Sequence, residues 1–225
     1  MHTIDQPLGQ LARRIPGATG VFQAYQLDFC CGGKQSLGEA ARARGVDPAA
    51  VAAQLDNLQQ QPAAGADWNR AELPRLVDHI QARFHNRHRE QLPELIRLAL
   101  RVEQVHGTHP ACPNGLADHL RAMQQELESH MQKEEQVLFP VIVMGQGARA
   151  GAPITVMRME HDQHGQALAQ LATLAHGLTP PSGACTTWRA LYLGLQTLRD
   201  DLMEHIHLEN NILFERAAAE VPAHA

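Results

Sequence analysis

Apolar residues recur every three or four positions along four long segments between Leu73 and Ala219. The second segment contains Leu116, Leu120, Met123, Leu127 and Leu138, and the fourth contains Leu191, Leu195, Leu198, Leu202 and Ile212. This spacing places the apolar side chains on one face of an α-helix, with polar residues on the other. We therefore predict four amphipathic helices in an all-α fold.

The four segments form two pairs that share the same internal spacing. The first segment carries His85, His88, Leu92 and Leu95, and the third repeats this pattern as His161, His164, Leu168 and Leu171. The second carries His130, Glu134, Leu138 and Phe139, and the fourth repeats it as His205, Glu209, Leu213 and Phe214. A helical hairpin that occurs twice predicts an up-down-up-down four-helix bundle over residues 73–220.

Residues 1–62 have a different pattern, with short helical pieces separated by turn signals. Gly32-Gly33 predicts a turn, Ser36 and Glu39 have the spacing of a capping box, and Asp47-Pro48 predicts another helix start. The segment QPAAGAD, residues 61–67, contains Pro and Gly but no periodic apolar residues. We predict a small helical N-terminal domain over 1–62, with the boundary in this segment.

Two His-x-x-x-Glu pairs interrupt the apolar faces of the bundle helices. His130 and Glu134 continue the stripe of the second segment, and His205 and Glu209 continue that of the fourth. Residues i and i+4 of a helix point in the same direction, so each pair presents an imidazole and a carboxylate toward the bundle interior. An unpaired ionised group is costly to bury, and a cation is a partner that all four side chains can share.

The H-x2-H pairs can supply further nitrogen ligands from the other helix of each hairpin. The spacing alone does not decide between His85 and His88, or between His161 and His164. Four nitrogens and two carboxylates are too many ligands for one ion. If both glutamates bridge two ions, a bridging oxo or hydroxo group would leave one open position on each. Imidazole and carboxylate ligands without thiolate favour iron or manganese, and zinc is compatible with them.

Composition and charge limit the classes of protein to which this sequence can belong. Hydrophobic residues make up 44% of the chain and aromatic residues only 4%, which favours packed helices. The formal charge of -5 is unlike the basic footprint of a nucleic-acid-binding protein. The start, MHTIDQPLGQLARRIPG, has no apolar run of signal-peptide length, and no stretch approaches the ~20 apolar residues of a membrane span. We expect a cytoplasmic protein without membrane or nucleic-acid partners.

Four cysteines are too few for a disulfide scaffold. Cys30 and Cys31 are adjacent, and neighbouring cysteines bridge each other only with strain. They are therefore either a buried structural pair or thiols that act on another molecule, by carrying iron or exchanging electrons.

Several segments together resemble a known family. HNRHREQLPELI, SHMQKEEQVLFP, MRMEHDQHG and DLMEHIHLENNILF are similar to a haemerythrin-type di-iron domain. The leading QPLGQLARRIPGA and YQLDFCCGGK resemble the N-terminal module of the repair-of-iron-centres family. The resemblance covers nearly the whole chain in the order found in that family. It implies a haemerythrin-like bundle preceded by a small CysCys module.

The resemblance also implies the ligands and the role. It assigns two non-haem irons to His85, His130, Glu134, His161, His205 and Glu209, with both glutamates bridging. The family restores iron–sulfur clusters damaged by oxidative or nitrosative stress, so the expected partners are proteins with damaged clusters. Oxygen-carrying haemerythrins have another histidine at the position of Gly165, which predicts a more exposed coordination here. His88 and His164 are expected to hydrogen-bond the ligand carboxylates.

Three functions fit the same six ligands. The first is an iron supplier for cluster repair, with Cys30 and Cys31 as a thiol relay. The second is an enzyme that reduces nitric oxide or a peroxide, and the third is a metal or gas sensor. Whether the protein is an enzyme is therefore open at this point, as is a homodimer formed through the N-terminal module.

Overall fold

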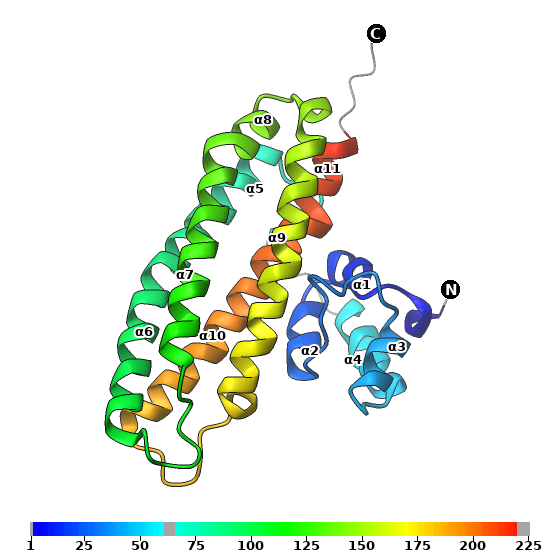
Figure 1. The fold of residues 1–225 in the computed structure, drawn as a ribbon. Helices are drawn as coiled ribbons and strands as arrows, with labels where there is room; N and C mark the ends of the chain where they lie inside the picture. Colours follow the sequence, from blue (N-terminus) through cyan, green and yellow to red (C-terminus); the bar gives the residue numbers. More distant parts are fainter. Residues whose placement is uncertain (1, 61–65, 220–225) are drawn as a thin grey trace.

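The computed structural model describes residues 2–60 and 66–219 of the chain. Within these residues the regular structure is helical and no β-strand is present. Figure 1 shows a long bundle, which contains α5 to α11, and a smaller group of helices, α1 to α4, beside it. The prediction of an all-α fold with a four-helix bundle and a small helical N-terminal part is confirmed.

Four rods form the bundle, and three of them combine two helices. Their bounds are α5 (Leu73–Ile80) with α6 (Asn86–His106), α7 (Leu116–Lys133) with α8 (Phe139–Val143), α9 (Gly147–Leu174), and α10 (Thr186–Leu208) with α11 (Phe214–Ala219). In Figure 1 the rods alternate in direction along the chain. This is the up-down-up-down order that the repeated hairpin predicts.

A π-helical turn joins the two helices in each combined rod. These turns span Gln81–His85, Glu134–Leu138 and Glu209–Leu213. A π-turn contains one extra residue, so it shifts which side chains point inward, and such turns are frequent at functional sites. Each of the three contains one of the predicted ligands, namely His85, Glu134 or Glu209. The amphipathic pattern predicts the helices but gives no sign of these turns.

Two apolar clusters fill the bundle, one on each side of the π-turns. The smaller includes Leu76, Ile80 and Phe139 at the end that carries α8 and α11. The larger includes Leu127 and Leu202 in the remaining length of the bundle. The predicted ligands are buried but belong to neither cluster. The polar residues therefore form a layer that divides the core.

The N-terminal part consists of short helices with well-defined starts. After a 3₁₀ turn at Thr3–Asp5 come α1 (Leu8–Arg14), α2 (Ala18–Ala24), α3 (Leu37–Ala43) and α4 (Pro48–Gln59). Ser36 and Glu39 form the predicted capping box at α3. Asp47 caps α4 by accepting a hydrogen bond from the Ala49 amide, 3.0 Å away. The local signals thus correctly predict where these helices start.

The N-terminal helices pack directly against the bundle. Phe22 and Phe29 belong to the same apolar cluster as Leu168 and Leu202 of the bundle, and α1 lies against the π-turn Glu209–Leu213. Most of the predicted boundary segment, residues 61–65, lies outside the described residues. The division into domains 1–62 and 73–220 therefore stays a prediction.

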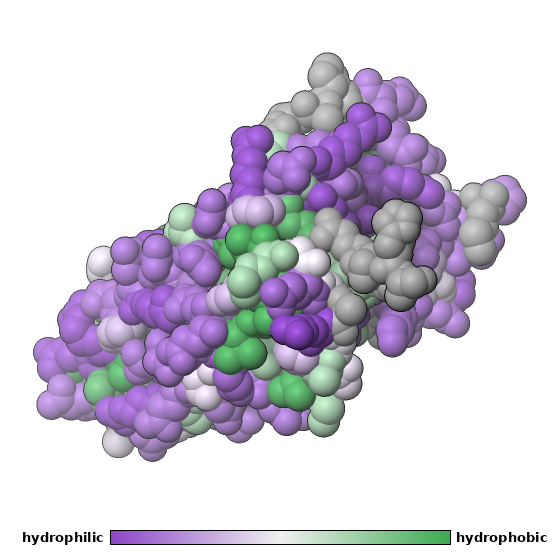
Figure 2. Space-filling model, turned by 90° about the horizontal axis from the view of Figure 1, so that it is seen from above, coloured by the Kyte–Doolittle hydropathy of each residue, from purple (hydrophilic) through white to green (hydrophobic). Residues whose placement is uncertain are grey.

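The surface is mainly hydrophilic, with hydrophobic side chains gathered in patches. Figure 2 shows such patches in the view from above. Val143 and Met144, at the end of α8, and Val156 and Met159, on α9, are among the exposed large hydrophobic residues. Within the part of the chain that the structure describes, no helix combines the length and the hydropathy needed to cross a membrane.

Candidate metal centre

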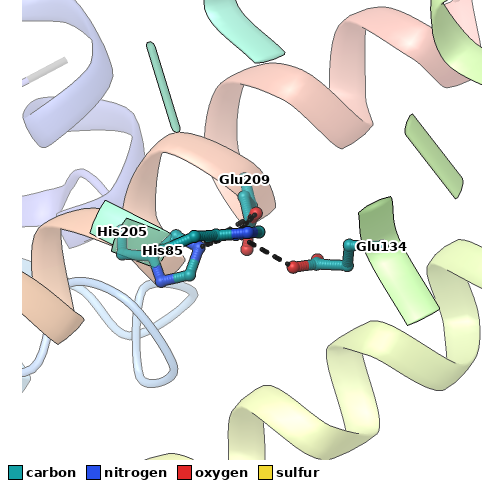
Figure 3. A group of neighbouring side chains, drawn as sticks. All are labelled: His85, Glu134, His205 and Glu209. Atoms are coloured by element: carbon teal, nitrogen blue, oxygen red, sulfur yellow. Dashed lines mark hydrogen bonds and ion pairs between the residues drawn. The ribbon is translucent and has the colours of Figure 1, made fainter. Parts of the chain in front are cut away.

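The six predicted ligands converge at the π-turns in two overlapping groups. One group is His85, Glu134, His205 and Glu209, and the other is His130, Glu134, His161 and Glu209. Each residue offers one ligand atom, and within a group these atoms all lie within 4.8 Å of one another. Both glutamates belong to both groups. In Figure 3 the Glu134 side chain points across the bundle toward Glu209 and two of the histidines.

The Glu209 carboxylate faces both histidine pairs, with one oxygen toward each. Its Oε1 lies 3.1 Å from His205 Nε2, and its Oε2 lies 3.1 Å from His161 Nε2. Glu134 approaches the other histidine of each pair, because its Oε2 lies 3.4 Å from His85 Nε2 and 3.5 Å from His130 Nε2. The two carboxylates therefore have the positions of bridging groups between two His pairs.

The outward nitrogens of three of the histidines have hydrogen-bond acceptors. The Nδ1 atoms of His85 and His130 lie 2.8 and 2.9 Å from the carboxylates of Glu135 and Glu160. The Nδ1 of His161 lies 2.9 Å from Asn210 Oδ1. An ionised carboxylate only accepts hydrogen bonds, so it holds the imidazole proton on Nδ1. Each Nε2 then carries a lone pair that points into the site.

This arrangement leaves two lone pairs opposite one another in the His130–His161 pair, whereas the Nδ1 of His205 has no acceptor among the described residues. His130 Nε2 lies 3.0 Å from His161 Nε2, and His85 Nε2 lies 3.1 Å from His205 Nε2. When neither nitrogen of a pair carries a proton, no hydrogen bond can join them and their lone pairs repel. A cation between the nitrogens removes the repulsion. The residues therefore fit a pair of metal ions, each facing two imidazoles and two carboxylates.

Glu134 gives independent support for a bound cation. Its side chain is fully buried, and neither carboxylate oxygen has a hydrogen-bond partner among the described residues. Burial, followed by the nearby Glu209 carboxylate, raises the pKa of Glu134 well above its ordinary value. Burial would also raise the pKa of Glu209, but His205 and His161 hold it well below the ordinary value. A polar group buried in this way normally has a partner.

His88 and His164 lie beside the two groups but belong to neither. Their rings lie 5.3 Å from the His205 ring and 4.9 Å from the His130 ring, centroid to centroid. Among the described residues neither ring nitrogen of His88 has a partner in good hydrogen-bond geometry, and neither does Nε2 of His164. The expectation that these nitrogens bond to the ligand carboxylates is therefore wrong for this structure. Burial and His205 lower the pKa of His88 well below its ordinary value.

Cys30 and Cys31 lie against the same site, on the side of α9. Both are free thiols, with their sulfur atoms 3.6 Å apart. The Cys31 thiol donates a hydrogen bond to the backbone oxygen of His161, 3.1 Å away. The Asn210 amide contacts the Cys30 carbonyl at 3.4 Å, while its side-chain oxygen accepts from His161. The Cys31 thiol therefore contacts the backbone of one predicted ligand.

Gly165 makes this approach possible. A Cβ atom at this position of α9 would lie 3.0 Å from the Cys31 sulfur, closer than side chains normally tolerate. The space beside α9 at this position is thus taken by the Cys31 side chain. A histidine at position 165 would need the space that the Cys31 side chain takes up. The glycine at this position therefore allows the N-terminal cysteines to approach α9.

Gly165→Ala should test this contact through a double-mutant cycle. Alanine in place of glycine inside a helix normally stabilises by about 1 kcal/mol. At position 165 we expect no gain, because the new methyl group meets the Cys31 sulfur. In a Cys31→Ala background the gain should return, measured as a higher thermal midpoint of the iron-free protein. Equal stabilisation in both backgrounds would contradict the contact.

Several residues that complete the site are absent from the sequence prediction. Glu135, Glu160 and Asn210 bond to ligand histidines, and Arg89 and Lys133 pair with the two carboxylates. Glu135, Glu160 and Asn210 are each next to a ligand in the sequence. Adjacent helical residues point about 100° apart, so these three residues lie outside the buried stripe on which the prediction of the ligands rests. An acidic or amide residue directly before or after a predicted ligand in the sequence is the signal that points to these three residues.

Five other histidines belong to neither ligand group. None of the five is buried: His79, His106, His109, His119 and His176. Cys112 and Cys185 are free thiols near the ends of the connections between bundle helices. The sequence analysis does not single out His207. This histidine is buried, and its Nδ1 forms a hydrogen bond with the Asn211 side chain. Its ring packs edge-on against Phe29 of the N-terminal part.

Comparison with known proteins gives the class and then the family. The family model described as "Hemerythrin HHE cation binding domain" matches residues 76–217, and the ScdA_N model, described as a domain of unknown function, matches residues 4–59. Together with the helical bundle and its His/Glu clusters, the first match defines a protein with a haemerythrin-type cation-binding domain.

Full-length relatives carry a more specific name. The iron-sulfur cluster repair protein YtfE of Dickeya chrysanthemi is 54% identical over 217 residues, covering 96% of this chain and 98% of the relative. The protein of the same name from Citrobacter koseri is 52% identical, covering 96% and 97%. That from Yersinia pseudotuberculosis is 54% identical, covering 95% and 96%. The chain belongs to the YtfE family of iron–sulfur cluster repair proteins.

Proposed function

We propose that this protein holds two iron ions and uses them to repair iron–sulfur clusters damaged by oxidative or nitrosative stress. The ligands are His85, His130, Glu134, His161, His205 and Glu209. The observation that carries the assignment is the pair of His–His contacts at 3.0 and 3.1 Å that share two buried carboxylates. The repair role is taken from the names of the full-length relatives.

Iron is the cation that the ligand set and the proposed role favour together. Imidazole nitrogens and carboxylate oxygens without thiolate suit iron and manganese. Bound iron would supply a redox-active Lewis acid with an exchangeable coordination position, and we propose an oxo or hydroxo bridge between the two ions. The protein orients the ligands through the outer hydrogen bonds of Glu135, Glu160 and Asn210.

In this proposal the iron is also the cargo, and the cysteines receive it. The Cys31 sulfur lies against the backbone of His161, and Cys30 lies beside it. Asp28, which accepts hydrogen bonds from the amides of both cysteines, adds a carboxylate within 4.8 Å of the two sulfurs. Iron that leaves His161 would therefore meet two thiols and a carboxylate, which can bind it in transit to a damaged cluster. The partners are proteins that contain such clusters.

A homodimer, a response to nitric oxide and a cytoplasmic site of action are further parts of the proposal. The four free thiols suit a reducing compartment. Nitric oxide would compete for the exchangeable position on the iron, so the same site could reduce it.

The first test is metal analysis after anaerobic reconstitution with ferrous iron. We expect two irons per chain, and near-ultraviolet absorption from an oxo-bridged pair after oxidation. Clearly fewer than two irons per chain would rule out the dinuclear assignment. The matched control is an Asp118→Asn variant, which changes an exposed carboxylate on α7 and should leave the iron content unchanged.

A second assay separates repair from reduction of nitric oxide. The reduced protein is incubated with an iron–sulfur enzyme that lacks its cluster and, separately, with nitric oxide. Recovery of that enzyme's activity without formation of nitrous oxide supports iron supply. Catalytic formation of nitrous oxide would instead identify the protein as a reductase.

A further inference from the structure

The six predicted ligands are closed off from solvent, so iron needs a route to reach them. All six have 0% or 1% of their surface exposed. On the side of α9, Cys31 and Asn210 cover His161, while Glu160 covers His130 and pairs with Lys133. The cavity on this side, about 620 Å³, is lined by Cys30, Cys31 and Asn210 but by none of the six ligands.

A groove between α6 and α7 leads toward the site from the opposite side. Its volume is about 450 Å³, and its walls include His88, Leu92, Glu128, Ser129 and Met131. In Figure 1 these two helices form the side of the bundle away from the N-terminal helices. His88 lines the groove but has no exposed surface, so it stands at the inner wall.

His88 is an unexplained polar residue at this inner wall. Among the described residues neither of its buried ring nitrogens has a partner in good hydrogen-bond geometry, although the Gln91 side chain, one turn away, interacts with the ring. Gln91 donates to Asp201, 2.9 Å away. The His88 ring lies 5.3 Å from that of His205, a predicted ligand. An imidazole between a groove and a metal centre can bind a metal ion that passes it.

Arg89, on α6, joins the two walls of the groove, and we call its ion pair with Glu128 on α7 the latch. Its guanidinium pairs with both oxygens of Glu128 on α7, at 2.9 and 3.2 Å. It also pairs with both oxygens of Glu135, at 2.9 and 3.1 Å, and Glu135 holds His85. One guanidinium thus faces two carboxylates, of which Glu128 lines the groove and Glu135 lies behind it, next to His85. The carboxylate, hydroxyl and imidazole groups along the groove are donors that suit a cation.

We propose that the α6–α7 groove is the route by which ferrous iron exchanges between solution and the dinuclear site, with His88 as a transient ligand and the Arg89–Glu128 pair as its latch. The proposal rests on the dinuclear assignment above. It concerns exchange with solution, whereas the cysteines on the other side concern delivery to a cluster. No electron transfer is involved, because the ion moves as Fe²⁺ from one set of ligands to the next.

The test measures how fast fully loaded ferrous protein gives up iron to an excess of a colorimetric Fe²⁺ chelator under anaerobic conditions. His88→Leu should release iron about tenfold more slowly, which needs only a small rise in the barrier. Glu128→Gln, which breaks the latch but leaves the Arg89–Glu135 pair, should release it several-fold faster. The matched control is His164→Leu, because His164 is the repeat-related histidine that does not line the groove, and its rate should equal that of the unsubstituted protein.

Iron content is measured before each rate. If the unsubstituted protein holds fewer than two irons, the dinuclear assignment fails. If it holds two but His88→Leu releases them at the unchanged rate, or His164→Leu is slowed equally, the route is wrong. If His88→Leu holds fewer irons than the unsubstituted protein, His88 is a resident ligand, which also overturns the proposal. Should His88→Leu not fold, an unchanged rate in Glu128→Gln overturns the latch by itself.

Discussion

Glu134→Gln should remove more than half of the bound iron and, at the same time, make the iron-free protein more stable. Glu134 belongs to both ligand groups, so a neutral amide at this position weakens both metal positions. In this structure the same carboxylate is fully buried and has no hydrogen-bond partner among the described residues. The substitution therefore removes a ligand from the iron-loaded state and a buried ionisable group from the iron-free state.

The expected gain in stability follows from the cost of burying an unpartnered ionisable group. Relief of such a penalty contributes about 1–3 kcal/mol, and ~1 kcal/mol shifts the thermal midpoint by about 2–4 °C in a chain of this size. Iron content is measured after reconstitution, and the midpoint is measured for protein treated with a chelator. Glu90→Gln is the control, because Glu90 is exposed on α6 and should change neither quantity. Lower stability of the iron-free variant would contradict the argument.

Weaker iron binding together with higher stability of the iron-free variant would distinguish a metal ligand from a structural residue. A glutamate that supports the bundle through hydrogen bonds would lower stability when changed, whether or not iron is present. Glu134 has no such bonds in this structure. We therefore expect the stabilising effect of the substitution to disappear once iron is added to the unsubstituted protein, because bound metal stabilises only the folded state that holds it.

The helix pattern predicts part of this site directly. His130 with Glu134, and His205 with Glu209, follow from i, i+4 geometry on the buried face, and all four side chains are buried as expected. The repeated hairpin correctly predicts that the two pairs meet. These features depend on local periodicity, which a sequence records directly.

The choice between His85 and His88 depends on information that periodicity lacks. Residues i and i+3 point in similar directions on a helix, and both histidines are indeed fully buried. The π-turn Gln81–His85 ends at the first of them, and such a turn has no clear signature in composition. Only the family resemblance selects His85, and the structure groups this residue, not His88, with the glutamates.

The contact between the N-terminal part and the bundle was also beyond the sequence pattern. Cys31 and His161 are 130 positions apart, and no periodic signal connects them. Gly165 was noted as a missing histidine, and its meaning as a space for the Cys31 sulfur follows only from the folded structure. Long-range packing of this kind depends on shape rather than on spacing along the chain.

Changing both Cys30 and Cys31 to alanine should preserve two irons per chain but lower the recovery of a damaged cluster by about tenfold, equivalent to ~1.4 kcal/mol in the rate-limiting barrier. Neither cysteine belongs to the two His/Glu groups, so iron binding should continue. Transfer should suffer because the Cys31 thiol contacts the His161 backbone from outside those groups, with the Cys30 thiol beside it. The measurement is the recovered activity of an iron–sulfur enzyme that has lost its cluster.

The single variants should differ, because the two thiols have different surroundings. Cys30 is buried, and its hydrogen bond with Cys31, together with burial, raises the pKa of Cys30 well above the ordinary value. Cys31 is partly exposed and lies against His161, so it is the thiol that iron would meet first. Cys31→Ala should therefore reproduce most of the loss seen in the double variant. Cys185→Ala is the control, since this thiol contacts His106 and not a predicted ligand. Unchanged recovery with both cysteines replaced would rule out the relay and leave the α6–α7 groove as the route for iron in both directions.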